Sequence, residues 1–176
     1  MMIPARLRWL WLTLGVVFLD RATKAWMESR PEYYFPHPVI TNYVNLVFTR
    51  NAGIAFSFFG GHASGTERIA LIVLTLIIIG FIAWLLVANR GASVVQAAGL
   101  ALLLGGATGN VTDRILHGAV TDFLEVWLRF LPWSIFHPWP AFNVADSAVT
   151  IGAFLVVLEV LFGRHPAGAS VEKKRR

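Results

Sequence analysis

The sequence predicts an all-α membrane protein with four transmembrane helices. Of its 176 residues, 56% are hydrophobic and only 14% are charged, and this composition is more apolar than that of an ordinary soluble domain. Four stretches each supply about the 20 mostly apolar residues that a membrane-spanning helix needs. These stretches are Leu7–Trp26, Ile69–Ala88, Ser93–Gly109 and Asn143–Phe162. They define one four-helix transmembrane domain over residues 1–164, followed by a basic tail over residues 165–176.

The first stretch could also be a cleavable signal peptide, because Arg6 and Arg8 precede its hydrophobic run. A signal peptide would continue with small residues at a cleavage site. Asp20, Arg21 and Lys24 stand there instead, which favours an uncleaved membrane helix. The chain has no cysteine, so disulfides, thiolate metal sites and thiol nucleophiles are excluded.

Four spans place both termini on one side of the membrane and the 27–66 and 110–142 loops together on the other side. The basic run Lys173–Arg176 predicts that the terminal side is cytoplasmic, since cytoplasmic segments are enriched in Lys and Arg. A basic tail beside a membrane is typical of contact with lipid headgroups. We therefore expect membrane lipids, and no nucleic acid, as partners of this tail.

The two outer loops differ in composition. In the first, the β-branched and aromatic runs Val39–Ile40 and Val44–Thr49 predict strands, and the triplet from Asn51 to Gly53 predicts a turn. We expect a small sheet at the membrane surface. The second loop is rich in tryptophan and phenylalanine between residues 123 and 142, a composition typical of the bilayer interface.

The unusual polar residues gather on the outer side of the predicted membrane domain. They are Asp20, Lys24, Asn110, Asp113, Arg114, Asp122, Asn143 and Asp146. Ionisable groups near the hydrocarbon region are costly, so their concentration predicts a functional site. Helical spacing places Gly106, Asn110 and Arg114 on one face of the third span, where they can point into one cleft with the start of the fourth.

Each of these residues also has a structural interpretation. Asn143 stands three residues before Asp146, which is the pattern of a helix-capping box. Asp113 and Arg114 could form a local ion pair at a helix end. Lys24 could extend to the lipid headgroups from the boundary of the first helix.

The acids permit one kind of catalysis. Two carboxylates that meet in a partly desolvated cleft share a proton, because one pKa rises, and such a pair supports acid–base hydrolysis of a peptide bond. The sequence has no His-Glu-x-x-His pair for zinc and no Gly-x-Ser-x-Gly elbow. A serine–lysine dyad of Lys24 with Ser57 or Ser147 stays open.

Two functions outside catalysis also fit polar residues in a membrane protein. A small proton- or cation-coupled transporter subunit would carry polar residues along a path through the whole membrane, whereas here they stop in the outer third. A structural scaffold would need no clustered acids at all. Hydrolysis explains the clustering better than either.

Five short motifs follow one another along the chain. They are Asp20-Arg-Ala-Thr-Lys24, Asn51-Ala-Gly-Ile-Ala-Phe56, Gly109-Asn-Val-Thr-Asp-Arg114, Val120-Thr-Asp-Phe123 and Phe142-Asn-Val-Ala-Asp-Ser147. In this order, on four predicted spans, they resemble the motifs of the lipoprotein signal peptidase family, also called signal peptidase II. The resemblance implies an intramembrane aspartic endopeptidase of the bacterial inner membrane, acting as a monomer without metal or cofactor. Its substrates are prolipoproteins, cut before a cysteine that carries diacylglycerol.

The resemblance also implies roles for individual residues. Asp122 and Asp146 match the catalytic dyad, at the periplasmic side of the membrane. The positions that contact substrates and peptide inhibitors of the globomycin type match Asn51, Gly106, Asn110, Arg114 and Asn143. Asp20, Lys24 and Asp113 match supporting positions in the motifs.

Family members cover the cleft with a β-cradle and a short periplasmic helix. The resemblance places these features in the 34–60 region and in the segment after Asp122. The stretch Leu124–Ala141 is longer and more aromatic than the family pattern, so we expect the cover of the cleft to differ here.

Overall fold

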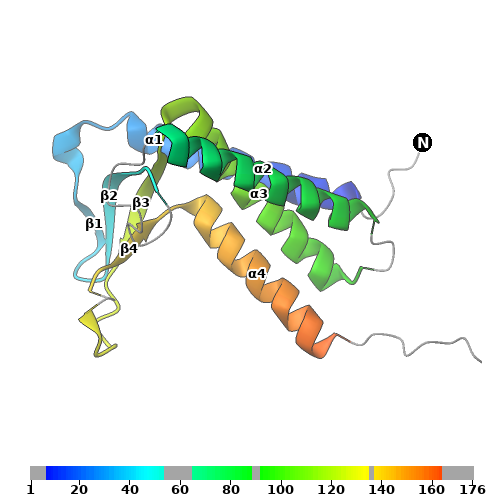
Figure 1. The fold of residues 1–176 in the computed structure, drawn as a ribbon. Helices are drawn as coiled ribbons and strands as arrows, with labels where there is room; N and C mark the ends of the chain where they lie inside the picture. Colours follow the sequence, from blue (N-terminus) through cyan, green and yellow to red (C-terminus); the bar gives the residue numbers. More distant parts are fainter. Residues whose placement is uncertain (1–6, 54–64, 89–91, 135–136, 164–176) are drawn as a thin grey trace, which may run out of the picture.

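The computed structural model describes residues 7–53, 65–88, 92–134 and 137–163. A four-stranded sheet lies at one end of the long helices, and α4 ends at the opposite end (Figure 1). The α-helices are α1 (Leu10–Glu28), α2 (Gly65–Ala88), α3 (Val94–His117) and α4 (Val144–Phe162). The strands are β1 (His37–Ile40), β2 (Val44–Asn51), β3 (Val120–Val126) and β4 (Trp139–Phe142). The 3-10 helices η1 (Leu7–Trp9) and η2 (Glu32–Tyr34) flank α1.

Helix α3 is central, because α1, α2 and α4 each pack against it. Its small residues allow this close approach. A Cβ on Gly99 would lie 2.9 Å from the carbonyl oxygen of Gly152 in α4, and one on Gly105 would lie 2.8 Å from the Cβ of Val16 in α1. The apolar core between α2 and α3 consists of Ile82, Leu86, Ala97, Leu100 and Leu104.

Three of the described helices, α2, α3 and α4, are long and apolar enough to cross a membrane. Large apolar side chains stay exposed along α2 and α4, among them Ile77, Phe81 and Phe154, as expected of surfaces that face lipid. Helix α1 differs because it carries Asp20 and Lys24, which it buries within the protein. Three of the four predicted spans thus correspond to helices long and apolar enough to cross a membrane, and the span predicted at α1 stays a prediction.

Helix α3 extends beyond the predicted span. We expected the span to end at Gly109, but the helix continues to His117. Gly118 ends it in the left-handed conformation, with a φ of 77° that glycine adopts without steric penalty. Asn110 and Arg114 therefore lie on the helix itself, on the face that their spacing predicts.

The sheet is antiparallel, in the order β1-β2-β3-β4. Strands β1 and β2 confirm the strands predicted in the first outer loop, whereas β3 and β4 come from the second outer loop, where none was predicted. Strand β3 pairs with β2 through Asn51 and Val120, and with β4 through Leu124 and Phe142. The sheet thereby joins the first outer loop, between α1 and α2, to the second, between α3 and α4.

The short helix expected after Asp122 is not an α-helix in the described part of that segment. There the chain continues as β3, passes through turns and a 3-10 position at Ser134, and returns as β4. Pro132, Pro138 and Pro140 disfavour a helix here, because proline lacks the N–H that a helix interior requires. Pairing with the edge of β2 satisfies the backbone of this segment instead.

Gly152→Val is expected to destabilise the contact between α3 and α4. A Cβ at this position would lie 2.7 Å from the carbonyl oxygen of Gly99, a backbone atom that moves only if α3 shifts. Overpacking of this kind costs about 1–3 kcal/mol, so the thermal unfolding midpoint in detergent should fall. Gly80→Val in α2 is the control, because nothing lies within 4 Å of its Cβ position. Equal midpoints for the two variants would contradict the packing argument.

Candidate active site

The start of α4 is a capping box. The side-chain oxygen of Asn143 accepts the backbone N–H of Asp146 at 2.8 Å, and Asp146 Oδ2 accepts the backbone N–H of Asn143 at 3.1 Å. The structural interpretation of this pair is therefore confirmed. It leaves Asp146 Oδ1 available, and this atom accepts a hydrogen bond from Asn110 Nδ2 at 2.7 Å.

The Asp122 side chain lies at the start of α4 as well, but it belongs to the sheet. It lies in β3, opposite Thr49 of β2, and is only 3% exposed. Its Oδ2 accepts a hydrogen bond from Asn51 Nδ2 at 3.1 Å, and its Oδ1 accepts one from Asn143 Nδ2 at 2.7 Å. Asn143 thus contacts both carboxylates, through its side-chain amide to Asp122 and through its backbone N–H to Asp146.

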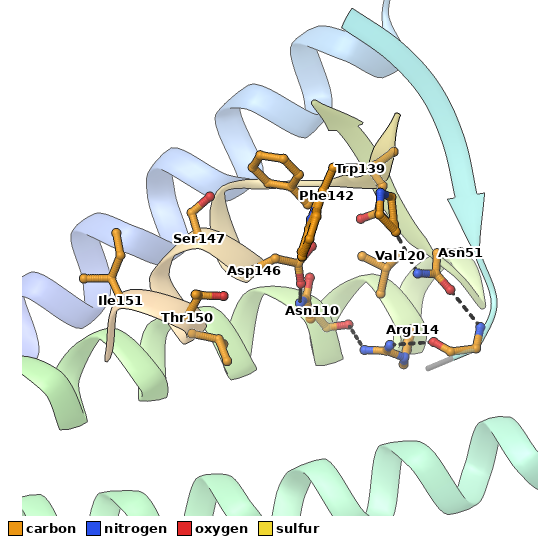
Figure 2. A pocket seen from close by; sticks show the side chains of 15 residues that line it. Asn51, Asn110, Arg114, Val120, Trp139, Phe142, Asp146, Ser147, Thr150 and Ile151 are labelled. Atoms are coloured by element: carbon orange, nitrogen blue, oxygen red, sulfur yellow. Dashed lines mark hydrogen bonds between the residues drawn. The ribbon is translucent and has the colours of Figure 1, made fainter. Parts of the chain in front are cut away.

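Both carboxylates line one cavity of about 610 Å³. Figure 2 shows the side chains of Asn51, Asn110 and Asp146 converging, with Arg114 below them. The polar wall comes from β2, α3, β3 and the first turn of α4, which contributes Asp146. The apolar wall comes from β4 and the first turns of α4, and its residues are Trp139, Pro140, Phe142, Val149 and Ile151.

Burial, and to a lesser extent the charge of Asp146, raise the pKa of Asp122 to about 6. Hydrogen bonds from Asn51 and Asn143 oppose this rise, because they stabilise the ionised carboxylate. A carboxyl group with such a pKa exchanges protons close to neutral pH. This is the property that acid–base catalysis requires.

Arg114 connects the helical wall of the cavity with the first outer loop. Its Nη2 donates to the Gly53 carbonyl at 3.1 Å and its Nη1 to the Asn110 carbonyl at 3.4 Å (Figure 2). Gly106, the glycine of the predicted site, lies where α3 meets α4. A Cβ there would lie 2.4 Å from the Ala145 carbonyl oxygen, so its position serves the approach of the two helices.

The three supporting residues form an ionic cluster beside the cavity. Lys24 Nζ lies 2.8 Å from Asp20 Oδ2 and 2.8 Å from Asp113 Oδ2, and all three side chains are fully buried. Asp20 Oδ1 accepts the backbone N–H of Ala145 at 3.0 Å, and Asp113 Oδ2 accepts that of Thr121 at 3.3 Å. The cluster therefore ties α1 and α3 to the start of α4 and to β3.

The sequence did not predict every residue that contributes to the site. Arg21 forms an ion pair with Asp113, although it stood in the first motif without an assigned role. Trp139 and Phe142 line the cavity, whereas their composition suggested only the bilayer interface. Pro140 stands between them in β4, an edge strand, where proline is tolerated.

A catalytic metal site and a serine–lysine dyad find no support in the described ranges 7–53, 65–88, 92–134 and 137–163. No group of three or more His, Asp or Glu residues there could hold a metal ion. Ser147 Oγ donates to the Asn143 carbonyl at 3.0 Å, and Lys24 is engaged by carboxylates on α1 and α3. Ser57 lies outside the described residues.

Several known proteins are similar to this chain. A family model described as signal peptidase (SPase) II matches residues 12–162. The lipoprotein signal peptidase of Pseudoalteromonas atlantica is 39% identical over 156 residues, which are 88% of this chain and 89% of its relative. That of Paraburkholderia phytofirmans is 42% identical over 153 residues, 87% of this chain and 84% of the relative. A bacterial membrane enzyme solved by the in meso method at 1.9 Å resolution is 27% identical, with a TM-score of 0.74 over 89% of this chain and 94% of the other.

Asp122→Asn is expected to stabilise the fold at neutral pH. The pKa of Asp122 is about 6 in the folded chain against 3.8 for an ordinary aspartate, so the folded state keeps a proton that the unfolded state loses between these values. The contribution of the Asp122 carboxyl group to the free energy of unfolding therefore falls as the pH rises from about 4 to 6 and stays low above 6. Thermal unfolding midpoints in detergent should be higher for the variant at pH 7.5, and the difference should shrink toward pH 4. A constant difference across this range would contradict the raised pKa.

Proposed function

Because the chain belongs to the lipoprotein signal peptidase (signal peptidase II) family, which removes signal peptides from prolipoproteins, we propose that Asp122 and Asp146 are its catalytic pair. One observation carries this assignment. The two carboxylates come from different parts of the fold, β3 and α4, and Asn143 holds both at the wall of one mostly apolar cavity. The interpretation as a transporter subunit is not supported, since the family is one of peptidases.

The pair performs hydrolysis by sharing one proton. The ionised carboxylate takes a proton from water as the water oxygen bonds to the peptide carbonyl carbon, and the protonated carboxyl group donates to the carbonyl oxygen. When the carbon–nitrogen bond breaks, a proton passes to the leaving amine. The raised pKa of Asp122 supports this residue as the proton donor, because its carboxyl group still holds a proton near pH 6.

The polar wall provides donors for the substrate. Asn51, Asn110 and Arg114 line the cavity beside the carboxylates, where they can orient a peptide carbonyl or stabilise its developing charge. We infer that Asn143 acts with them by holding Asp122, and that Gly106 shapes the floor by bringing α4 close. Peptide inhibitors of the globomycin type would contact the same residues.

The apolar wall suits a signal peptide that ends in a lipidated cysteine. Trp139 and Phe142 of β4 and Ile151 of α4 present hydrophobic surface beside the carboxylates. Diacylglycerol chains on the substrate cysteine would lie in the surrounding lipid, where burying them is favourable by about 0.8 kcal/mol for each methylene group. This arrangement explains why cleavage before a diacylglyceryl cysteine can occur at the membrane surface.

We infer a four-span topology with both termini in the cytoplasm of the bacterial cell, the site on the periplasmic side and the chain acting as a monomer. The sheet and both carboxylates lie at the same end of the helices (Figure 1). Helix α1 can cross the membrane together with α2, α3 and α4, because its charges at Asp20 and Lys24 are paired inside the protein, away from lipid. The basic run Lys173–Arg176 favours the cytoplasmic side for the termini.

Asp122→Asn and Asp146→Asn should each abolish cleavage of a diacylglyceryl prolipoprotein, because each removes one half of the proton exchange. We expect kcat to fall by about 10²–10⁴-fold or more in each variant, measured by gel shift of the purified substrate in detergent. Glu125→Gln is the matched control. It also changes an acid to an amide in β3, but Glu125 binds Asn45 and Trp127 away from the cavity, so activity should stay close to that of the wild type.

Ser147→Ala separates the aspartic mechanism from a serine–lysine dyad. Ser147 donates its hydroxyl proton to a backbone carbonyl, so the variant should retain activity. Loss of cleavage in Ser147→Ala together with full activity in a folded Asp122→Asn or Asp146→Asn variant would make the assignment of the catalytic pair wrong.

A further inference from the structure

We propose that Lys24 is a positioning residue of the peptidase site, acting through the side-chain amide of Asn110. The inference rests on the catalytic pair proposed above. It assigns to a buried lysine beside the cavity the task of fixing the group that contacts Asp146. The ionic cluster would then have a part in catalysis as well as in folding.

The ammonium group of Lys24 has three neighbours. Its Nζ lies 2.8 Å from Asp20 Oδ2, 2.8 Å from Asp113 Oδ2 and 3.2 Å from Asn110 Oδ1. The Lys24 side chain is 0% exposed, so water does not supply further partners. An ammonium group has three N–H donors and no acceptor, and the three neighbours match the three donors.

Charge balance accounts for only two of these neighbours. Asp20 and Asp113 carry two negative charges, and Lys24 and Arg21, which pairs with Asp113, carry two positive ones. Buried charges need such pairing because they have lost water. The third donor of Lys24 goes to Asn110, a neutral side chain, so this contact serves something other than neutralisation.

The contact gives the Asn110 amide a single workable orientation. Its Oδ1 accepts from Lys24 Nζ and from Asn143 Nδ2, each at 3.2 Å, while its Nδ2 donates to Asp146 Oδ1 at 2.7 Å. A flipped amide would place its NH₂ group against an ammonium that cannot accept, and its oxygen against the acceptor atom of Asp146. Lys24 therefore keeps the donor end of Asn110 directed at the carboxylate.

This arrangement holds Asp146 from two sides. Asn110 Nδ2 binds Oδ1, and the backbone N–H of Asn143 binds Oδ2. The positive charge of Lys24 also polarises the amide between them, which strengthens the N–H bond to Asp146. Without Lys24 the Asn110 oxygen keeps only its contact with Asn143, so the donor that orients Asp146 is held less firmly. Lys24 itself is not among the residues that line the cavity, so substrate binding should change little.

Two charge-balanced double variants test the proposal. Lys24→Met/Asp20→Asn removes one charge of each sign and the contact to Asn110 and leaves the Arg21–Asp113 pair, whereas Arg21→Met/Asp113→Asn removes one charge of each sign, leaves the Lys24–Asp20 pair and keeps that contact. We expect kcat of the first to fall by about 10²-fold with KM changed less than about threefold, as for a misplaced catalytic group, and kcat of the second to fall by less than about tenfold. Unfolding midpoints of both are measured in the same detergent.

A second measurement asks whether Lys24 acts through Asn110. In an Asn110→Ala background, adding Lys24→Met/Asp20→Asn should lower kcat no further, because the amide through which Lys24 acts is already absent. The same loss as in the wild-type background would overturn the proposal. So would equal kcat values for the two charge-balanced variants, a loss confined to KM, or a Lys24 variant that fails to fold where the Arg21 variant folds.

These outcomes are distinct from failure of the proposed function. Full activity of a folded Asp122→Asn or Asp146→Asn variant would remove the catalytic pair, and the positioning role with it. If the wild type depends on both aspartates and the two charge-balanced variants behave alike, the catalytic pair stands and only the role of Lys24 is wrong.

Discussion

The fully buried ammonium of Lys24 between Asp20 and Asp113 is the contact on which the site end of the molecule depends. A charge in this environment is tolerated only when partners surround it. The two acids also accept hydrogen bonds from backbone N–H groups, Asp20 from Ala145 and Asp113 from Thr121. One ionic cluster thereby fixes where α4 begins and where β3 leaves α3, and both carboxylates of the proposed catalytic pair lie one residue beyond these anchors.

The capping box at the start of α4 has two uses in the same structure. Capping satisfies the free N–H groups of the helix end, and here it needs only one oxygen of Asp146 and one of Asn143. The remaining atoms of both side chains reach Asn110 and Asp122. The structural and the catalytic interpretations of Asn143 and Asp146 are therefore compatible, because each side chain has enough hydrogen-bonding atoms for both.

The sheet brings a strand residue into contact with the N-cap of a membrane helix. Asp122 lies on β3, between β2 and β4, and is almost completely buried. Strand β2 contributes Asn51, and β4 contributes the aromatic wall of the cavity. A carboxylate on a paired strand is held more firmly than one on a free loop, which suits a reaction that needs two acids at fixed positions.

Local pattern in the sequence determined the apolar spans, the strands of the first outer loop, the shared face of Asn110 and Arg114, and the five motifs that indicate the family. These features depend on hydrophobic length, side-chain period and residue order, which a single sequence displays. The tertiary structure alone decided that the second outer loop completes the sheet and that Asn143 joins both carboxylates. It also decided that Lys24 faces inward to two acids rather than outward to lipid headgroups. Such contacts join residues up to 125 positions apart, as between Asp20 and Ala145, and the partners of a buried polar group are chosen by packing, which no local pattern records.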